Sequence, residues 1–317
     1  MDLDSMQRII EQAKGLRKPI WQVVMDYDVE TRMTTPETSM ERMRATWRAM
    51  VDAADAYSGD RRSLSGLVGG DGERMRTYYR HHNSIGGEFT AEVIAQALAM
   101  GENNACMNRI VAAPTAGACG VMPAVLIPLW RKEGIPEDKM VEALYVSSAI
   151  GAVIAAKASI SGAAGGCQAE IGSASAMAAG ALTYLHGGMP EQICHAVAMA
   201  LKNLMGLVCD PVAGLVEVPC VKRNVIGAMN AIAAADMALA GIQSRIPVDE
   251  VIEAMGDVGR RLPEEFRETA LGGLAVTPTG RAVKERMAGN KKKHRTLTIK
   301  DGRWKMARPE EKSGAPS

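Results

Sequence analysis

Residues 189–204 read MPEQICHAVAMALKNL, and this stretch shows most clearly how the chain folds. Pro190 suits the first turn of a helix, where its missing N–H would have no partner, and Glu191 favours the positive end of the helix dipole. The apolar side chains then recur at a spacing near 3.6 residues and fall on one stripe, namely Ile193, Val197, Leu201 and Leu204. The stretch therefore predicts an amphipathic helix that buries this stripe.

The same start signal, a proline followed by acidic residues, recurs along the chain. It is found at Thr35-Pro36-Glu37, Ile135-Pro136-Glu137-Asp138, Ile246-Pro247-Val248-Asp249-Glu250 and Leu262-Pro263-Glu264-Glu265. Alternating apolar and polar runs bounded by hairpin turns, which would predict strands, are nearly absent. The sequence therefore predicts an all-α protein.

The composition predicts how these helices pack. The chain has 317 residues, of which 47% are hydrophobic, so it is long enough to bury the core of one large domain. Aromatic residues make up only 4%, whereas there are 32 glycines and 21 methionines. Small side chains let helix backbones approach closely, and methionine fills irregular gaps. We therefore expect a single large helical domain with closely packed core helices rich in Ala, Gly and Met, together with glycine-rich active-site loops.

The chain divides by composition into three parts. Residues 1–62 carry much charge and contain two predicted amphipathic helices, and turn residues gather at 63–71, which suits a linker or an active-site loop. Residues 63–280 are dense in Ala, Gly and Met and form the predicted main helical domain. Residues 281–317 are basic around 291–295 and end in a polar stretch. We predict that they form a partly flexible, solvated tail rather than a site for an anionic partner.

Charge and hydropathy argue against several classes of protein. With 37 basic and 36 acidic residues, the chain has no charge excess that would attract nucleic acid or an anionic membrane surface. The most apolar stretch, residues 141–164, is interrupted by Lys157, which favours a buried helix over a membrane span. The acidic N-terminus lacks the pattern of a signal peptide, so six cysteines indicate reduced thiols and a cytoplasmic protein.

Three of the six cysteines lie in unusual surroundings. Cys167, Cys209 and Cys220 each lie beside glycine or proline rather than within a periodic apolar run, so they could converge from separate loops. Three thiolates would leave one coordination position of a metal centre open for a substrate. The spacings are long, however, with 41 and then 10 intervening residues and no Cys-x-x-Cys pair. Spacing alone therefore leaves both a metal site and ordinary buried thiols open, and the latter reading suits Cys106 and Cys194.

The residues around these cysteines resemble a known family. Five segments carry the likeness: Ala113-Pro-Thr-Ala-Gly-Ala-Cys-Gly120, Gly165-Gly-Cys-Gln-Ala-Glu170, Cys209-Asp-Pro-Val-Ala-Gly214, Val218-Pro-Cys-Val-Lys-Arg-Asn224 and Leu271-Gly-Gly-Leu-Ala-Val-Thr-Pro-Thr-Gly280. In this order they closely resemble the alpha subunit of iron–sulfur-dependent L-serine dehydratases (L-serine deaminases), and the likeness spans about residues 65–280.

The resemblance implies an enzyme of amino-acid degradation. It implies a [4Fe–4S] cluster held by Cys167, Cys209 and Cys220 in an all-helical catalytic domain over residues 63–280. The implied reaction is β-elimination of water from L-serine, which yields pyruvate and ammonia. Single-chain relatives carry a second domain with Ser-Ser-Ser-His-Thr-type and Gly-His-Gly-Thr-type segments, which are absent here. We therefore expect a separate beta subunit, and a homo-oligomer is also compatible with the sequence.

Several residues could contact the substrate or take part in the reaction. Arg223 and Asn224 follow Cys220 and could reach a substrate at the cluster, although a surface turn explains them equally well. Thr115 and Gly117 lie in a segment whose backbone N–H groups could form an anion-binding nest, or else a tight turn between helices. Glu170 is expected to hydrogen-bond around the Cys167 loop.

The catalytic base is not identified by the sequence. Lys157 lies in an otherwise small and apolar stretch, where an unpaired lysine is costly, so either a site role or a structural ion pair explains it. Asn203, six residues before Cys209, is a weaker candidate. The base could also lie on the missing partner.

Three alternatives to an L-serine dehydratase remain open at this stage. The same fold could act on L-threonine or on another β-substituted amino acid. The chain could be a pyridoxal-phosphate lyase that uses Lys157 as its Schiff base, although no strand-linked phosphate loop supports that hypothesis. It could also be a non-catalytic subunit that only binds a cluster.

Overall fold

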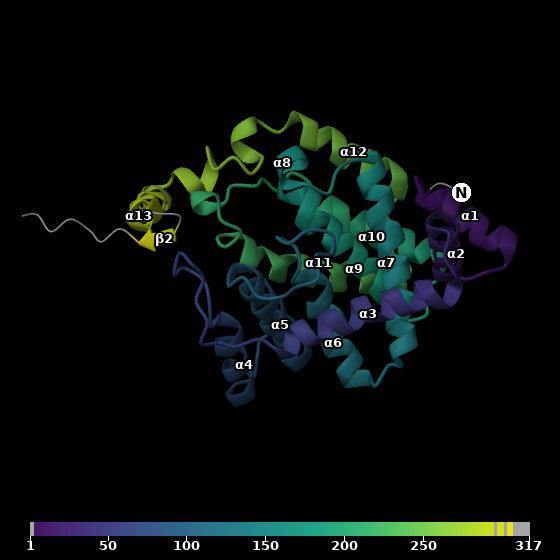
Figure 1. Ribbon diagram of the computed structural model, residues 1–317. Coiled ribbons are helices and arrows are strands. Elements are labelled where there is room, and N and C mark those ends of the chain that lie inside the picture. The colour runs from purple at the N-terminus through teal and green to yellow at the C-terminus, as the bar shows by residue number, and fades with distance from the viewer. Residues whose placement is uncertain (1–2, 295–296, 301–302, 307–317) are drawn as a thin grey trace, which may run out of the picture.

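The computed structural model describes residues 3–294, 297–300 and 303–306, with side chains placed through residue 289. The described chain is built almost entirely of helices (Figure 1). The α-helices are α1 (Met6–Leu16), α2 (Ile20–Arg32), α3 (Pro36–Asp55), α4 (Asp71–His81), α5 (Gly87–Ala105), α6 (Val121–Glu133), α7 (Glu137–Lys157), α8 (Gly162–Gly165), α9 (Ser173–Leu185), α10 (Pro190–Leu204), α11 (Cys220–Leu239), α12 (Val248–Arg261) and α13 (Pro278–His294). The prediction of an all-α protein is confirmed.

Shorter elements connect these helices. A π-helix, η1 (Gln168–Gly172), precedes α9, and three 3₁₀ helices follow later, η2 (Val212–Gly214), η3 (Glu264–Phe266) and η4 (Gly273–Val276). The described chain ends in a small antiparallel hairpin of β1 (Leu297–Lys300) and β2 (Arg303–Met306), which the sequence pattern did not predict.

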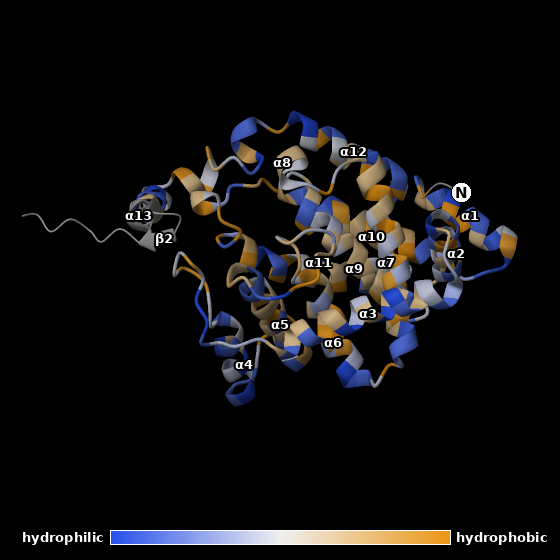
Figure 2. Ribbon diagram, viewed as in Figure 1, coloured by the Kyte–Doolittle hydropathy of each residue, from blue (hydrophilic) through white to orange (hydrophobic). Residues whose placement is uncertain are grey.

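Helix α9 lies at the centre of the molecule and packs against α6, α7, α10 and α11. Its residues from Ser173 to Thr183 are all buried, and most of them are Ala, Ser or Gly. A Cβ on Gly180 would overlap the Cδ1 atom of Ile150 on α7, so the Ile150 side chain fills the space that a larger residue at position 180 would need. Figure 2 shows the hydrophobic residues gathered on these central helices. The close packing predicted from the composition is therefore confirmed.

Helix α7 contains most of the apolar stretch noted in the sequence. By length and composition alone it could cross a membrane, but 72% of its most apolar 18-residue stretch is buried inside the fold. It packs against α9 on one side and against α2 and α3 on another. A buried core helix explains its composition fully.

The N-terminal region forms three helices, whereas we predicted two. Arg17 and Met33 adopt left-handed backbone conformations that end α1 and α2, so the chain turns twice before α3 begins at Pro36. Buried residues of all three helices, such as Trp47, belong to the same hydrophobic cluster as the central helices.

Two expectations for the C-terminal half need correction or fall outside the described residues. The predicted helix after Pro263 is only the 3₁₀ turn η3, because the backbone that follows it bonds instead to Cys209. Helix α13 continues through His294, so most of the basic run at 291–295 is helical. The predicted flexibility of the last residues, 307–317, lies outside the described chain.

Candidate metal centre

Two of the three cysteines singled out in the sequence, Cys167 and Cys209, lie together in the fold, and Arg223 links the segment that begins with Cys220 to Cys167. Cys167 precedes η1, Cys209 lies in the connection after α10, and Cys220 is the first residue of α11. Their exposed fractions are only 2%, 2% and 6%. The sulfurs of Cys167 and Cys209 and one carboxylate oxygen of Glu170 all lie within 4.8 Å of one another. Burial, and then the charges of Cys167 and Glu170, raise the pKa of the Cys220 thiol to about 12.

Local backbone geometry brings Cys167 to Cys209. Gly166 has a left-handed φ of 74°, and a Cβ there would come within 2.8 Å of Leu262, so the turn before Cys167 requires glycine. The buried Gln168 then donates from its backbone N–H to the Leu207 carbonyl at 3.0 Å, while its side-chain oxygen accepts the Gly206 N–H at 2.8 Å. These bonds tie the Cys167 loop to the segment that leads into Cys209.

Cys209 is held from its other side by a distant segment. Its N–H donates to the Phe266 carbonyl at 2.8 Å, and its own carbonyl accepts the Glu268 N–H at 3.0 Å. The π-helix that follows Cys167 is also informative, because π-helical turns are rare and often mark functional sites.

A buried ion pair lies beside the sulfurs. Arg223 donates from Nη1 to Cys167 Sγ at 3.3 Å and to the Val208 carbonyl at 2.7 Å, and from Nη2 to Asp210 Oδ1 at 2.9 Å. The side chains of Arg223 and Asp210 are only 12% and 5% exposed. The hydrogen bond with Cys209, and then the charge of Arg223, lower the pKa of the Cys167 thiol. The same bond with Cys167, together with burial, raises the pKa of Cys209.

Glu170 is the carboxylate that faces the cysteines. It accepts a hydrogen bond from Thr115 Oγ1 at 2.7 Å. Burial raises its pKa, and the charge of Glu268 raises it further, against the opposing effect of Thr115. Side-chain positions at Gly117 and Gly162 would come within 3.2 and 2.7 Å of its oxygens, so these glycines leave the room that the carboxylate occupies.

Asn224 connects the predicted loop over residues 113–120 to the cysteines. Its side chain is buried, and Oδ1 accepts the Gly120 N–H at 2.8 Å. Nδ2 donates to the carbonyls of Gly117 and Cys220, both at 2.9 Å. The structure thus brings together all four residues predicted to bind substrate. Thr115 is linked to the site by its hydrogen bond to Glu170, and Gly117 by its hydrogen bond from Asn224. Arg223 and Asn224 bond directly to the segments that carry the cysteines.

The two candidates for a catalytic base lie elsewhere. Lys157 Nζ pairs with Glu253 Oε1 at 2.5 Å, and this hydrogen bond raises the lysine pKa. A Schiff-base lysine needs the opposite shift, because only the neutral amine is nucleophilic. Asn203 is exposed and donates to Asn230 Oδ1 at 2.7 Å. The hydrogen bonds that the structure describes therefore give neither residue a contact with the cysteines.

Sequence reasoning missed Asp210, which completes the ion pair with Arg223. The only signal for it was its position directly after Cys209, and adjacency in sequence does not show where a carboxylate points. Its second oxygen accepts the Leu274 N–H at 2.9 Å, which links the segment after η3 to the site.

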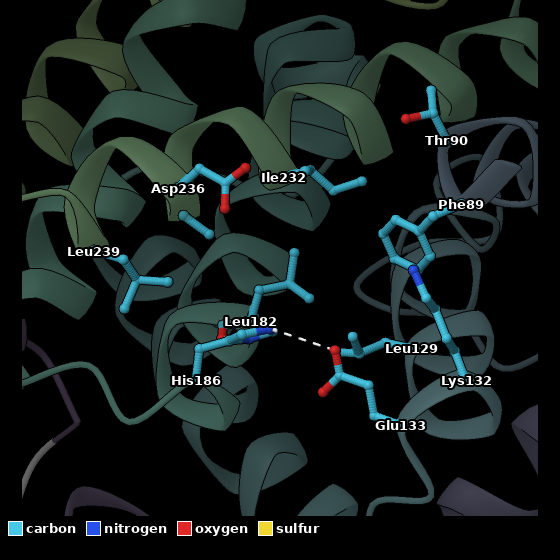
Figure 3. A pocket seen from close by; sticks show the side chains of 11 residues that line it. Phe89, Thr90, Leu129, Lys132, Glu133, Leu182, His186, Ile232, Asp236 and Leu239 are labelled. Carbon is cyan, nitrogen blue, oxygen red and sulfur yellow. Dashed lines mark hydrogen bonds and ion pairs between the residues drawn. The ribbon is translucent and has the colours of Figure 1, made fainter. Parts of the chain in front are cut away.

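A separate cavity of about 320 Å³ lies between α5, α6, α9 and α11 (Figure 3). Apolar residues such as Phe89 line it, and at its edge His186 Nε2 lies 4.0 Å from Glu133 Oε1. Asp236, which also lines it, follows Cys220 by 16 residues on α11. At the rise of an α-helix, that separation is roughly 24 Å, so this cavity is distinct from the metal centre.

Comparison with known proteins identifies the family of this chain. The model of the family "Serine dehydratase alpha chain" matches residues 15–275, a span that includes all three cysteines. A Bacillus subtilis (strain 168) protein, "Probable L-serine dehydratase, alpha chain", is 46% identical over 285 residues, which cover 90% of this chain and 95% of the relative. "L-serine dehydratase, alpha chain" of Peptoniphilus asaccharolyticus is 40% identical over 287 residues, covering 89% of this chain and 97% of the relative.

A longer relative matches over a shorter span. "L-serine dehydratase 1" of Escherichia coli (strain K12) is 47% identical over 182 residues, which are 57% of this chain but only 40% of that protein. Because the family match covers most of the sequence and the two alpha chains align along nearly their full lengths, this chain belongs to the serine dehydratase alpha chain family.

Proposed function

We propose that this chain is the alpha chain of an L-serine dehydratase, in which it carries the metal centre for β-elimination of water from L-serine. The observation that carries the proposal is that Cys167 and Cys209 lie together in a buried place beside Glu170, and that Arg223, three residues after the buried Cys220, reaches the Cys167 sulfur, in a member of this family. Loss of the α-proton and the β-hydroxyl gives aminoacrylate, whose imine tautomer takes up water to release pyruvate and ammonia. Atoms balance, since the water lost is regained, and there is no net oxidation.

The donor set fits a [4Fe–4S] cluster. Cys167, Cys209 and Cys220 are all buried, the first two lie together, and soft thiolate sulfur is the ligand type that iron–sulfur clusters use. Arg223 adds a positive charge and a hydrogen bond to one sulfur, as expected beside an anionic centre. Such a cluster, held by three thiolates, supplies a Lewis-acidic iron for the substrate hydroxyl.

Within this chain, we propose that Glu170 is the general base that removes the α-proton of the substrate. Its carboxylate lies beside the sulfurs, where substrate must bind, and the part of the chain that the structure describes provides it with no cationic partner. A raised pKa suits a general base that works near neutral pH. Thr115 orients the carboxylate through its hydroxyl, and Gly117 leaves the room that the carboxylate occupies.

A separate beta chain is the expected partner. Two relatives of nearly equal length are named alpha chains, and the longer Escherichia coli relative contains more than twice the matched length. We infer that a beta chain supplies the remaining substrate contacts in this system. A reducing, cytoplasmic location suits the six cysteines, all of which are free thiols.

The test is anaerobic co-expression with the beta chain, followed by measurement of iron, acid-labile sulfide and pyruvate release. We expect about four irons per alpha chain and activity with L-serine. Cys209→Ser should lose both the cluster and the activity. Cys194→Ser, at a partly exposed cysteine that lines a different cavity, should keep both. A colourless, iron-free enzyme that still forms pyruvate would contradict the proposal. An enzyme that is active with L-threonine but inactive with L-serine would reassign the substrate.

The role of Glu170 is tested separately with Glu170→Gln, which preserves the size of the side chain. We expect the iron content and KM to stay close to those of the parent enzyme, while kcat falls by about 10²- to 10⁴-fold, the usual contribution of a general base. An unchanged kcat would exclude Glu170 as the base.

A further inference from the structure

Arg223 lies where the three cysteine-bearing segments meet. It follows Cys220 by three residues, so it lies about one turn further along α11. Its Nη1 reaches Cys167 Sγ at 3.3 Å, on the second segment. The same nitrogen donates to the carbonyl of Val208, and Nη2 donates to Asp210, so both residues that flank Cys209 are engaged.

Asp210 is held in turn by a fourth segment. Its Oδ2 accepts the backbone N–H of Leu274 at 2.9 Å, while Oδ1 receives Arg223. Gly273 has a left-handed φ of 56°, and a Cβ at that position would overlap the Asp210 carboxylate. The carboxylate is therefore fixed from two sides, and it presents one oxygen to the guanidinium.

We propose that Asp210 and Arg223 form a positioning pair, which holds the three cysteine segments at the spacing that the cluster needs and supplies a hydrogen bond to the Cys167 sulfur. The proposal rests on the proposed function, because it concerns the same cluster. It reassigns Arg223 from substrate binding to cluster retention, since its two terminal nitrogens already donate to protein groups and its side chain is 12% exposed. A guanidinium suits this role because its planar fork can serve several acceptors at once, whereas a lysine ammonium is a compact point charge.

The test compares three variants in the enzyme assembled with its beta chain. Asp210→Asn removes the charge that orients the guanidinium but keeps the size of the side chain. Arg223→Lys keeps the positive charge but cannot reach all three acceptors. Lys222→Met is the matched control, because Lys222 is the adjacent cation on α11, is 71% exposed and pairs with Asp71 away from the cysteines.

Each variant is reconstituted anaerobically, and the decay of its cluster absorbance is followed after exposure to air. We expect Asp210→Asn and Arg223→Lys to lose the cluster about 10-fold faster than the parent enzyme, in line with the usual effect of removing an outer-sphere partner of a metal ligand. The KM for L-serine, measured on the cluster-loaded fraction, should not change. Lys222→Met should match the parent enzyme in both measurements.

The opposite pattern would overturn the inference. If Arg223 binds the substrate carboxylate, Arg223→Lys would raise KM while cluster decay stays at the parent rate. If Asp210→Asn does not fold, as judged by circular dichroism, Arg223→Lys still decides between these outcomes. Failure of the parent chain to take up any cluster would instead refute the proposed function, so the two failures are distinguishable.

Discussion

Asn224 gives the sharpest test of how the site is built. Its side chain is 1% exposed and satisfies two backbone groups of the loop before α6, the Gly120 N–H and the Gly117 carbonyl. Asn224→Ala would leave the buried Gly120 N–H and the partly buried Gly117 carbonyl without this partner, whereas the Cys220 carbonyl keeps the backbone hydrogen bond of its helix. Each unsatisfied buried group costs about 1–3 kcal/mol. We therefore expect the variant to lose about 2–4 kcal/mol of unfolding free energy, near the lower end of the summed range because the loop can relax.

The assay is urea-induced unfolding of the metal-free, reduced protein, followed by far-UV circular dichroism. The unfolding midpoint should fall while the dependence on urea stays the same, which indicates a change in stability rather than in the unfolded state. Asn203→Ala is the control, because Asn203 is an exposed helical asparagine bonded only to Asn230 in the described structure. It should change the free energy by no more than about 0.5 kcal/mol. An equally small effect of Asn224→Ala would refute the assigned hydrogen bonds.

Three further predictions concern packing and charge. Trp47 is 1% exposed and packs edge to face on Trp130, with 5.5 Å between the ring centroids. Trp47→Ala should therefore lower the free energy of unfolding by about 3–5 kcal/mol and leave a single thermal transition. A separate transition of the N-terminal helices would contradict the shared core. A Cβ on Gly227 would lie 2.9 Å from Val121, so Gly227→Ala should lower the free energy of unfolding by about 1–3 kcal/mol. A Cβ on Gly15 would have nothing within 4 Å, so Gly15→Ala should stabilise α1 by about 0.5–1 kcal/mol in the same denaturant titration. The pKa of Glu170 is raised in the folded state, so its contribution to the free energy of unfolding is fully present below about pH 4.3 and is lost as pH rises through the folded pKa. Metal-free Glu170→Gln should therefore gain stability relative to the parent protein as pH rises through that window. A difference in unfolding free energy that does not depend on pH would exclude a raised pKa.

The site shows where sequence reasoning succeeded and where it could not. The cysteines and the four substrate-binding candidates lie in distinctive segments that the structure brings together, while their roles in binding a metal and a substrate stay predictions. Lys157 was ambiguous from the sequence, since either a site role or an ion pair explains a lysine in an apolar stretch. Its partner Glu253 lies 96 residues further along the chain, and no local pattern could have identified it.

The helices themselves follow largely from the sequence alone. A helix start depends on residues within one turn, so Pro190 and Glu191 suffice to predict where α10 begins, and the spacing of apolar residues predicts which face it buries. The predicted helix after Pro263 failed for the converse reason. Its local signal is sound, but Phe266 and Glu268 give their backbone groups to Cys209, and this tertiary pairing outweighs the local preference.

The chain's own sequence thus determined the fold class and the positions of most helices, because these depend on interactions within a few residues. Only the tertiary structure decided that Glu170 faces the sulfurs, that Asp210 fixes Arg223, and that Lys157 is paired elsewhere. Each of these depends on which distant backbone segments lie side by side, and that is set by the packing of the whole core around α9.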